Sequence, residues 1–504
     1  MISIGLCFKK VPYTPAEPEA TLVTLTFDAN GGSVTTSTIK QSPNSSITLP
    51  TPTRSGYTFD GWYTALSGGT KVTYTKMPSA SKTLYARWTS VWTGTKATSF
   101  ARGSGTSSDP YIIETAAQLA YFQSQVNDNN VTYSGKYIKM VNNIDLNNKS
   151  WSSIGKGTKS GTGSGSTYIF SGNFDGGENV IYNLKPDGNM YYIGLFGRVL
   201  DCTIQNLTIA SGSITVPSDN GNSSSGAVIG YAVNVTVKNC INKINVAGEG
   251  GECGGIIGQI NGSTTTRGSK VSDCINYGKI SGYGVHTGGI IGKSTDILEI
   301  KNCHNYATVT TNGSNYAGGV VGYQTTKKIT MERCGNEGTV SGASNVAGIV
   351  GAVDGSELNT ITQCYNKGDI TASSNYASGI LGSLAGDTTI SYCYNTGAIK
   401  ATVNNAAGIA ANAGTIKNCY STGIITAPNY SCGIASRYTS SHTYSNNYYL
   451  SGSARYALYN KASAAGYMSK SSSELSASSI VTTLNNGSTV YKAVSGGYPV
   501  FTWQ

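Results

Sequence analysis

Residues 301–309, KNCHNYATV, place Cys303, His304 and Asn305 side by side, and these are the three residue types with which a thiol nucleophile is activated. The flanking run, DILEIKNCHNYATVTTNG, is rich in β-branched residues and alternates apolar with polar, which is typical of a strand. Successive side chains of a strand point to opposite faces, so neighbouring Cys303 and His304 cannot reach each other as nucleophile and base.

Repetition of the same word points to a scaffold as well. The cysteine returns at a spacing near 30 residues, as Cys240, Cys274, Cys303, Cys334, Cys364, Cys393 and Cys419. The residue two positions later is Asn242, Asn276, Asn305, Asn336, Asn366 and Asn395, and then Ser421. The position between them varies and includes Ile275, His304 and Gly335. Because a catalytic histidine would not be replaced by isoleucine or glycine in sister repeats, we interpret the motif as structural.

A second word, Gly-apolar-apolar-Gly, recurs with the same period, for example as GIIG at Gly289 and GVVG at Gly319. A third short β run completes each period. Three strand signals in about 30 residues predict one coil of a right-handed parallel β-helix. In such a stack, equivalent residues lie about 4.8 Å apart. The cysteines would then fill one buried column as free thiols, and the asparagines would form a hydrogen-bonded ladder at a turn.

Both ends of this stack carry a candidate cap. Thr115 with Gln118 forms a capping box before a helical pattern, and Ser471 with Glu474 forms a second, with a helix expected to run to about Leu484. The sequence from about residue 98 onward resembles the GLUG-motif proteins through DPYIIETAAQLAYF, FSGNFDG, the glycine words and the closing GGYPVFTW. The resemblance implies a bacterial surface protein of the kind often described as an adhesin, and it implies no chemistry.

The bulk composition fits a large β structure with many turns. Only 12% of the 504 residues are charged, Gly accounts for 64 residues, and the net charge of +10 is scattered along the chain, which disfavours a nucleic-acid binder. No apolar stretch is long enough to span a membrane. Cys7 is a candidate remnant of a lipid-attachment site, but Leu6 beside it fits such a site poorly, and a plain tail is the favoured interpretation. The expected divisions are a tail and Pro-rich linker at 1–20, a β module at 21–90, a β-helix at 91–450 with its N-terminal cap at about 98–150, and a C-terminal cap at 451–504.

The 21–90 module carries the words TFDANGG, PTRSGYTFDGWYT and LYARW. On these words it resembles the Listeria–Bacteroides repeat, also called the internalin B-repeat. The resemblance implies a small β-grasp-like module and exposure outside the cell.

A carbohydrate-active β-helix enzyme, either a polysaccharide lyase or a glycoside hydrolase, is the alternative function. Such enzymes use paired acids, or calcium-binding acids with a basic residue, on the outer face. The coils contain scattered single acids, namely Asp273, Asp296, Asp354, Asp369 and Asp387. His286 and His304 are expected at outward or turn positions and His442 in a loop, with no metal-ligand spacing between them. We therefore expect no catalysis, no metal and no cofactor.

One outer feature suggests binding. The position after the cysteine is Tyr365, Tyr394 and Tyr420 in three consecutive coils, which predicts an exposed aromatic stripe suited to sugar rings or a partner surface. The sequence thus favours an extracellular or cell-surface adhesin or ligand-binding stalk, expected to be monomeric, whose partner is a glycan or a host or bacterial surface protein.

Overall fold

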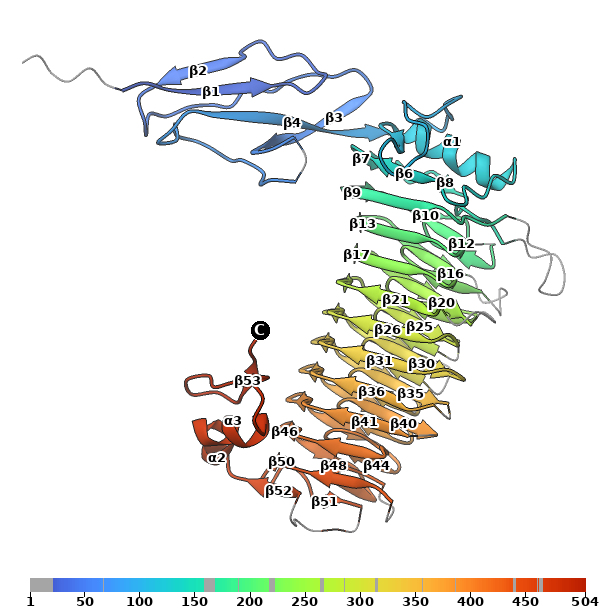
Figure 1. Ribbon diagram of the computed structural model, residues 1–504, viewed down its shortest axis with the longest axis vertical. Helices are drawn as coiled ribbons and strands as arrows, with labels where there is room; N and C mark the ends of the chain where they lie inside the picture. The colour runs from blue at the N-terminus through green and yellow to red at the C-terminus, as the bar shows by residue number, and fades with distance from the viewer. Residues whose placement is uncertain are drawn as a thin grey trace, which may run out of the picture. The chain divides into compact units, whose positions relative to one another are not determined.

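The computed structural model describes residues 21–504 except 67, 158–167, 189, 217–222, 263–266, 285, 313–315, 356, 386, 438–440, 460 and 462–465 (Figure 1). The tail and linker expected at 1–20, with Cys7, lie outside the described residues. The chain divides into two units, Met1–Thr89 and Ser90–Gln504. None of the helices that the structure describes has the length and apolar character needed to cross a membrane.

The first unit is a small β module. Its strands are β1 (Val23–Asp28), β2 (Thr38–Gln41), β3 (Tyr57–Tyr63) and β4 (Lys82–Val91). β1 pairs antiparallel with β2 and parallel with β4. The aromatic words seen in the sequence form its core, where Trp62 and Trp88 are almost fully buried and the Trp62 indole donates to the Pro50 carbonyl oxygen at 2.7 Å.

The second unit begins with a capped helix. The first elements are β5 (Tyr111–Ile113), α1 (Ala116–Asn127), β6 (Tyr137–Met140), β7 (Asn143–Asp145), β8 (Ser150–Trp151), β9 (Asn173–Tyr182) and β10 (Lys185–Pro186). The capping box of Thr115 and Gln118 is present at the start of α1. Leu119 and Phe122 of this helix are buried in the core that continues through the unit, so α1 closes the first coil (Figure 1).

The rest of the second unit is a parallel β-solenoid of about ten turns with about 30 residues in each. One row holds ten strands. Nine of them lead into or contain the glycine words, namely β11 (Tyr192–Ile193), β15 (Ser224–Gly226), β19 (Glu252–Gly254), β24 (His286–Gly288), β29 (Tyr316–Gly318), β34 (Val346–Ala347), β39 (Ala377–Ser378), β44 (Asn405–Ala407) and β48 (Tyr430–Ala435), and β51 (Tyr456–Leu458) lies after the last of these words. Seven strands follow them, namely β12 (Phe196–Leu200), β16 (Ile229–Val233), β20 (Ile257–Asn261), β25 (Ile291–Ser294), β30 (Val321–Thr325), β35 (Val350–Asp354) and β40 (Leu381–Ala385).

Two further rows of strands complete the coils. The strands around the cysteine word are β13 (Thr203–Ile209), β17 (Thr236–Asn242), β21 (Ser269–Ser272), β22 (Ile275–Asn276), β26 (Leu298–Lys301), β27 (His304–Asn305), β31 (Ile329–Glu332), β32 (Gly335–Asn336), β36 (Asn359–Thr362), β37 (Tyr365–Asn366), β41 (Thr388–Ser391), β42 (Tyr394–Asn395), β45 (Thr415–Lys417), β46 (Tyr420–Ser421), β49 (Thr443–Ser445) and β50 (Asn447–Leu450). The third face holds β14 (Ser213–Val216), β18 (Asn245–Gly248), β23 (Ile280–Gly282), β28 (Val309–Thr311), β33 (Val340–Gly342), β38 (Ile370–Ala372), β43 (Ile399–Ala401) and β47 (Ile425–Thr426).

The C-terminal segment differs from the expected single helix. It contains β52 (Tyr467–Lys470), α2 (Ser472–Ser476), α3 (Ser478–Asn485), β53 (Tyr491–Lys492) and β54 (Val500–Phe501). The capping box of Ser471 and Glu474 is present, but Ala477 adopts an extended conformation and separates two short helices. The segment lies beside the last coils, near β46 and β50 (Figure 1).

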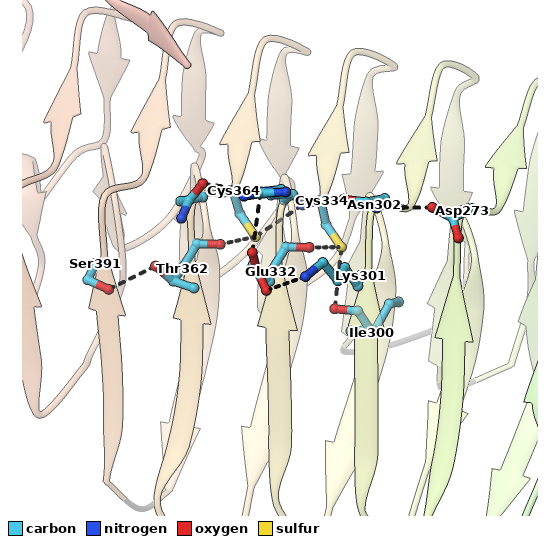
Figure 2. A network of polar contacts seen from close by, with 11 residues as sticks. Asp273, Ile300, Lys301, Asn302, Glu332, Cys334, Thr362, Cys364 and Ser391 are labelled. Atoms are coloured by element: carbon cyan, nitrogen blue, oxygen red, sulfur yellow. Dashed lines mark hydrogen bonds and ion pairs between the residues drawn. The ribbon is translucent and has the colours of Figure 1, made fainter. Parts of the chain in front are cut away.

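The repeated cysteines lie in one buried column. All seven are fully buried, and the ten cysteines that the structure describes form no disulfide. Figure 2 shows that the thiols donate hydrogen bonds to backbone carbonyl groups. Cys334 Sγ lies 3.5 Å from the Glu332 carbonyl oxygen, and Cys364 Sγ lies 3.3 Å from the Thr362 carbonyl oxygen. Burial raises the pKa of the Cys303 thiol, as it raises the pKa of Cys253 to about 11.

The asparagines form a continuous ladder beside that column. Each side-chain amide donates to the Oδ1 atom of the next coil's asparagine at 2.7–2.8 Å, from Asn242 through Asn395. Each amide also donates to the carbonyl oxygen two residues later, as from Asn366 to Gly368 at 2.8 Å. The ladder packs closely against the glycine words. A Cβ atom added at Gly348 would lie only 2.3 Å from the Asn366 Cγ atom, so only glycine leaves room for the asparagine there. Both repeated words are therefore parts of one packing arrangement.

We predict that Asn366→Ala lowers the free energy of unfolding by about 1–3 kcal/mol, because it leaves buried partners without their hydrogen bonds. Chemical denaturation measures this change. Asn312→Ala is the matched control, since Asn312 is exposed, and a change within about 0.5 kcal/mol is expected there. Equal losses at the two positions would contradict a structural role for the ladder.

We also predict that the buried thiols react slowly in the native protein. The Cys7→Ser variant leaves the ten cysteines described above as the only thiols. A thiol reagent such as Ellman's should label them fully in denaturant, and should label almost none within minutes in buffer, because the buried thiols are inaccessible to the reagent. Fast labelling of several cysteines in buffer would show that the column is open.

Candidate functional site

The neighbouring residues Cys303 and His304 do not have the geometry of a nucleophile and its base. Cys303 Sγ lies 3.3 Å from the Lys301 carbonyl oxygen, inside the column. The His304 ring packs on the other side of the strand, with its centroid 6.0 Å from the Tyr365 ring and 5.9 Å from the Trp503 ring. Burial lowers the pKa of His304. The structure therefore places the thiol and the imidazole on opposite faces.

The expectation that Tyr365, Tyr394 and Tyr420 are exposed is wrong. The three rings do stack from coil to coil, with centroids 5.5 Å and then 5.1 Å apart. They are only 3%, 1% and 1% exposed, respectively. An external aromatic ligand or sugar therefore has no access to this stripe.

The C-terminal segment covers the tyrosine stack. Phe501 packs on Tyr394 with ring centroids 5.0 Å apart, and Tyr491 packs on Tyr420 at 5.9 Å. The Tyr394 hydroxyl donates to Gln504 Oε1 at 2.9 Å. Each of these three contacts joins residues more than 70 positions apart, so the local repeat pattern could not reveal them.

The five aspartates singled out from the sequence are not brought together. Asp273 accepts from the Asn302 amide at 3.0 Å (Figure 2), and Asp369 accepts from the Ala398 backbone at 2.9 Å. Asp296 is buried and accepts from the Ser269 hydroxyl at 2.7 Å. Asp354 accepts from the Tyr323 hydroxyl at 3.0 Å, and Asp387 is exposed. Across the described part of the chain, no group of three or more His, Cys, Asp or Glu residues is placed to hold a metal ion.

A different surface gathers side chains able to bind a ligand, at the two sides of the glycine words. We define the first outer row as Tyr192, Ser224, Glu252, His286, Tyr316, Asn345, Tyr376, Asn405 and Tyr430, which strand register places one above another. The second outer row is Arg198, Tyr231, Gln259, Lys293, Tyr323, Ala352, Ser383, Asn412 and Arg437. The residues next in sequence to the first row, such as Ile193 and Ala317, are fully buried, as strand alternation requires.

The two outer rows touch each other across the glycine words. Tyr192 and Tyr231 have ring centroids 4.6 Å apart. Further along the solenoid, the Tyr316 and Tyr323 rings are also 4.6 Å apart and stacked, and the Arg437 guanidinium donates to the Tyr376 hydroxyl at 2.7 Å. The compact glycine turn brings the two sides this close, and we call the two rows together the outer band.

The middle of this band holds a titratable cluster. Glu252 Oε1 lies 3.5 Å from His286 Nδ1 and 3.4 Å from Lys293 Nζ, while His286 is 7% exposed and stacks on Tyr323 with ring centroids 4.6 Å apart. Burial acts to raise the pKa of Glu252, but His286 and Lys293 outweigh it, and the pKa is lowered. Burial, aided by Lys293, lowers the pKa of His286. His286 thus lies in the outward-facing row, but the Tyr316 and Tyr323 rings that stack on it leave it only slightly exposed.

This cluster lacks the spacing of a glycosidase. Its carboxylate is Glu252, and Asp354 reaches the same cluster through Tyr323. The two acids belong to coils three steps apart, which corresponds to roughly 14 Å along the stack at the usual strand spacing. Glycoside hydrolysis needs carboxyl groups about 5–9.5 Å apart. Glu252 and Asp354 therefore do not have the spacing of a two-carboxylate glycosidase site.

The sequence signal for the outer rows lay beside the glycine words. In HTGGIIGK, YAGGVVGY, YASGILGS and YSCGIASR, a ring lies three residues before the glycine word, and in YAGGVVGY a second ring lies just after it. The glycine words were interpreted only as markers of the coil, so the outer rows formed by the positions beside them were not predicted.

Comparison with known proteins supports two different parts of the chain. Residues 24–87 match the family model of the Listeria-Bacteroides repeat domain. Internalin H of Listeria monocytogenes is 40% identical over 84 residues, which cover 16% of this chain and 15% of internalin H. Halomucin of Haloquadratum walsbyi is 31% identical over 172 residues, which cover 33% of this chain and 2% of halomucin. The chain thus spans only a small part of these relatives.

Among solved structures, a Bacteroides ovatus chain provisionally named an immunoglobulin A1 protease aligns over 80% of this chain and 96% of its own length. The sequence identity is 21% and the TM-score is 0.37, so this likeness carries no argument about activity. Residues 24–87 are therefore a Listeria-Bacteroides repeat domain, followed by a parallel β-solenoid.

Proposed function

We propose that this protein is a non-catalytic extracellular or cell-surface protein that binds an extended glycan along its two outer rows, as an adhesin or a ligand-binding stalk. The observation that carries the proposal is the in-register band of side chains beside the glycine words. Six of its members are tyrosines, namely Tyr192, Tyr231, Tyr316, Tyr323, Tyr376 and Tyr430. Aromatic faces pack on the apolar faces of sugar rings, and a solenoid stacks such side chains along its length, where an extended ligand can contact several of them.

Several features support a position outside the cell. The Listeria-Bacteroides repeat domain and the partial similarity to internalin H and halomucin are both typical of surface proteins. The resemblance of the solenoid to GLUG-motif proteins points the same way. Low charge density and extensive hydroxyl and amide content also suit a solvent-exposed stalk.

The alternative function, a carbohydrate-active enzyme, rests on one specific observation. Glu252, His286 and Lys293 form a partly buried titratable cluster within the proposed binding band. Perturbed groups in contact with a ligand surface are candidates for catalysis. The separation of Glu252 from Asp354 disfavours the two-carboxylate mechanism, and we regard the cluster as part of a binding surface.

We predict that the purified chain cleaves no pectin, alginate or glycosaminoglycan, with or without Ca²⁺. Release of reducing ends and of unsaturated products, measured over a day at high protein concentration, tests this prediction for both hydrolases and lyases. Turnover that is present in the natural chain and lost in Glu252→Gln would overturn the non-catalytic proposal and identify the cluster as its active site.

A binding measurement tests the role of the outer rows. We predict that glycans captured by the chain on a glycan array lose at least tenfold in affinity when Tyr192 and Tyr316 are changed together to Ser. The matched control changes Tyr277 and Tyr306 to Ser, since these rings also stack, with centroids 5.1 Å apart, and are 50% and 40% exposed outside the rows. Loss of binding in the control pair alone would place the contact elsewhere and contradict the proposal.

A further inference from the structure

The last coils of the outer rows line an open pocket of about 520 Å³. Its lining residues are Tyr376, Asn404, Asn405, Asn412, Asn429, Tyr430, Arg437 and Tyr459. The volume lies within the range of small-ligand sites, and it exceeds that of a single sugar unit. The pocket thus combines three aromatic rings, four amides and one cation, and its lining contains no carboxylate.

Two of the amides have unused hydrogen-bonding capacity. Asn412 Oδ1 is buried and has no hydrogen-bond partner among the described residues. Asn405 is only 9% exposed, and its side chain makes no hydrogen bond within the described part of the chain. A buried polar atom without a partner is destabilising, and Asn412 Oδ1 is such an atom. Hydroxyl groups of a ligand would satisfy both amides.

The cation of the pocket is held in place but not neutralised. Arg437 lies with its guanidinium carbon 5.0 Å from the centre of the Tyr376 ring, and it donates to the Tyr376 hydroxyl at 2.7 Å. It forms no ion pair with any residue that the structure describes. A guanidinium fixed on an aromatic ring keeps further N–H donors in a planar fork that matches a carboxylate.

A pair of aromatic rings also lines the pocket. The Tyr430 and Tyr459 rings have centroids 4.2 Å apart, and Tyr459 is 39% exposed. A pyranose ring presents an apolar C–H face that packs on such rings while its hydroxyls point outward. The pocket therefore offers separate contacts for the face, the hydroxyls and a negative group of a sugar.

We propose that this pocket binds a carboxylated sugar unit of the glycan, with the carboxylate on Arg437, hydroxyls on Asn405 and Asn412, and the ring against Tyr459. The inference rests on the proposed function and narrows its ligand to acidic glycans. A hexuronate of a plant or algal polysaccharide and the sialic acid of a host glycan share the required chemistry. A bound carboxylate would also pair with the one lining cation, which neutral sugars would leave unpaired.

Isothermal titration calorimetry of the full chain tests the inference, with trigalacturonate and 3′-sialyllactose as acidic probes and their uncharged counterparts, a neutral galactose trisaccharide and lactose, as controls. We expect at least one acidic probe to bind tenfold or more tightly than its neutral counterpart. Arg437→Gln should remove that preference without changing the melting temperature. Lys400→Gln is the matched control, because it removes one exposed positive charge from another face of the solenoid and should leave affinity unchanged.

The outcomes separate the inference from the proposed function. Binding of trigalacturonate alone or of 3′-sialyllactose alone supports the inference and identifies the source of the acid. Equal binding of acidic and neutral probes, or equal effects of Arg437→Gln and Lys400→Gln, overturns the acidic-sugar inference while glycan binding stands. If none of the four probes binds, the inference is overturned, and an array that also captures no glycan removes the proposed function as well.

Discussion

The contact between the asparagine ladder and the glycine words is the constraint on which the rest of the structure depends. Asn366 fits only because Gly348, in the glycine word that precedes it in the chain, has no side chain, and the same relation repeats for Asn336 with Gly319. A one-residue slip between coils would break the amide chain and drive a side chain into backbone. Register is therefore fixed coil by coil, and the 30-residue period follows from it.

Fixed register inside the solenoid also organises its outside. Positions that flank the glycine words are free to vary, yet each lies directly above its counterpart in the next coil. Tyr316 and Tyr323 can meet across the turn only because the glycines between them allow a tight corner. A scaffold built from cysteine, asparagine and glycine thus presents tyrosine, amide and charged groups in two ordered rows without altering the core.

The interior was predictable from sequence because its rules are local and repeated. The period, the buried cysteine word and the capping boxes at Thr115 and Ser471 all follow from short-range patterns. The prediction that Tyr394 is exposed was wrong because Phe501, more than 100 residues away in the sequence, covers its ring. The break between the two short helices at Ala477 was not predicted either. Leu475, Ile480 and Leu484 pack in one cluster with the tyrosine stack, a distant contact that the local helical pattern does not contain. The outer rows were missed because their residue types vary, and only stacking reveals them as one surface.

A crystal structure of the full chain with a bound acidic oligosaccharide would test most directly the central claim that stacked register turns a structural repeat into a glycan-binding surface. The account predicts ligand density in the pocket at Arg437, with the carboxylate within hydrogen-bond distance of the guanidinium and further units following the two outer rows. Density confined to the Listeria-Bacteroides repeat domain, or to the face that carries Tyr277 and Tyr306, would contradict it.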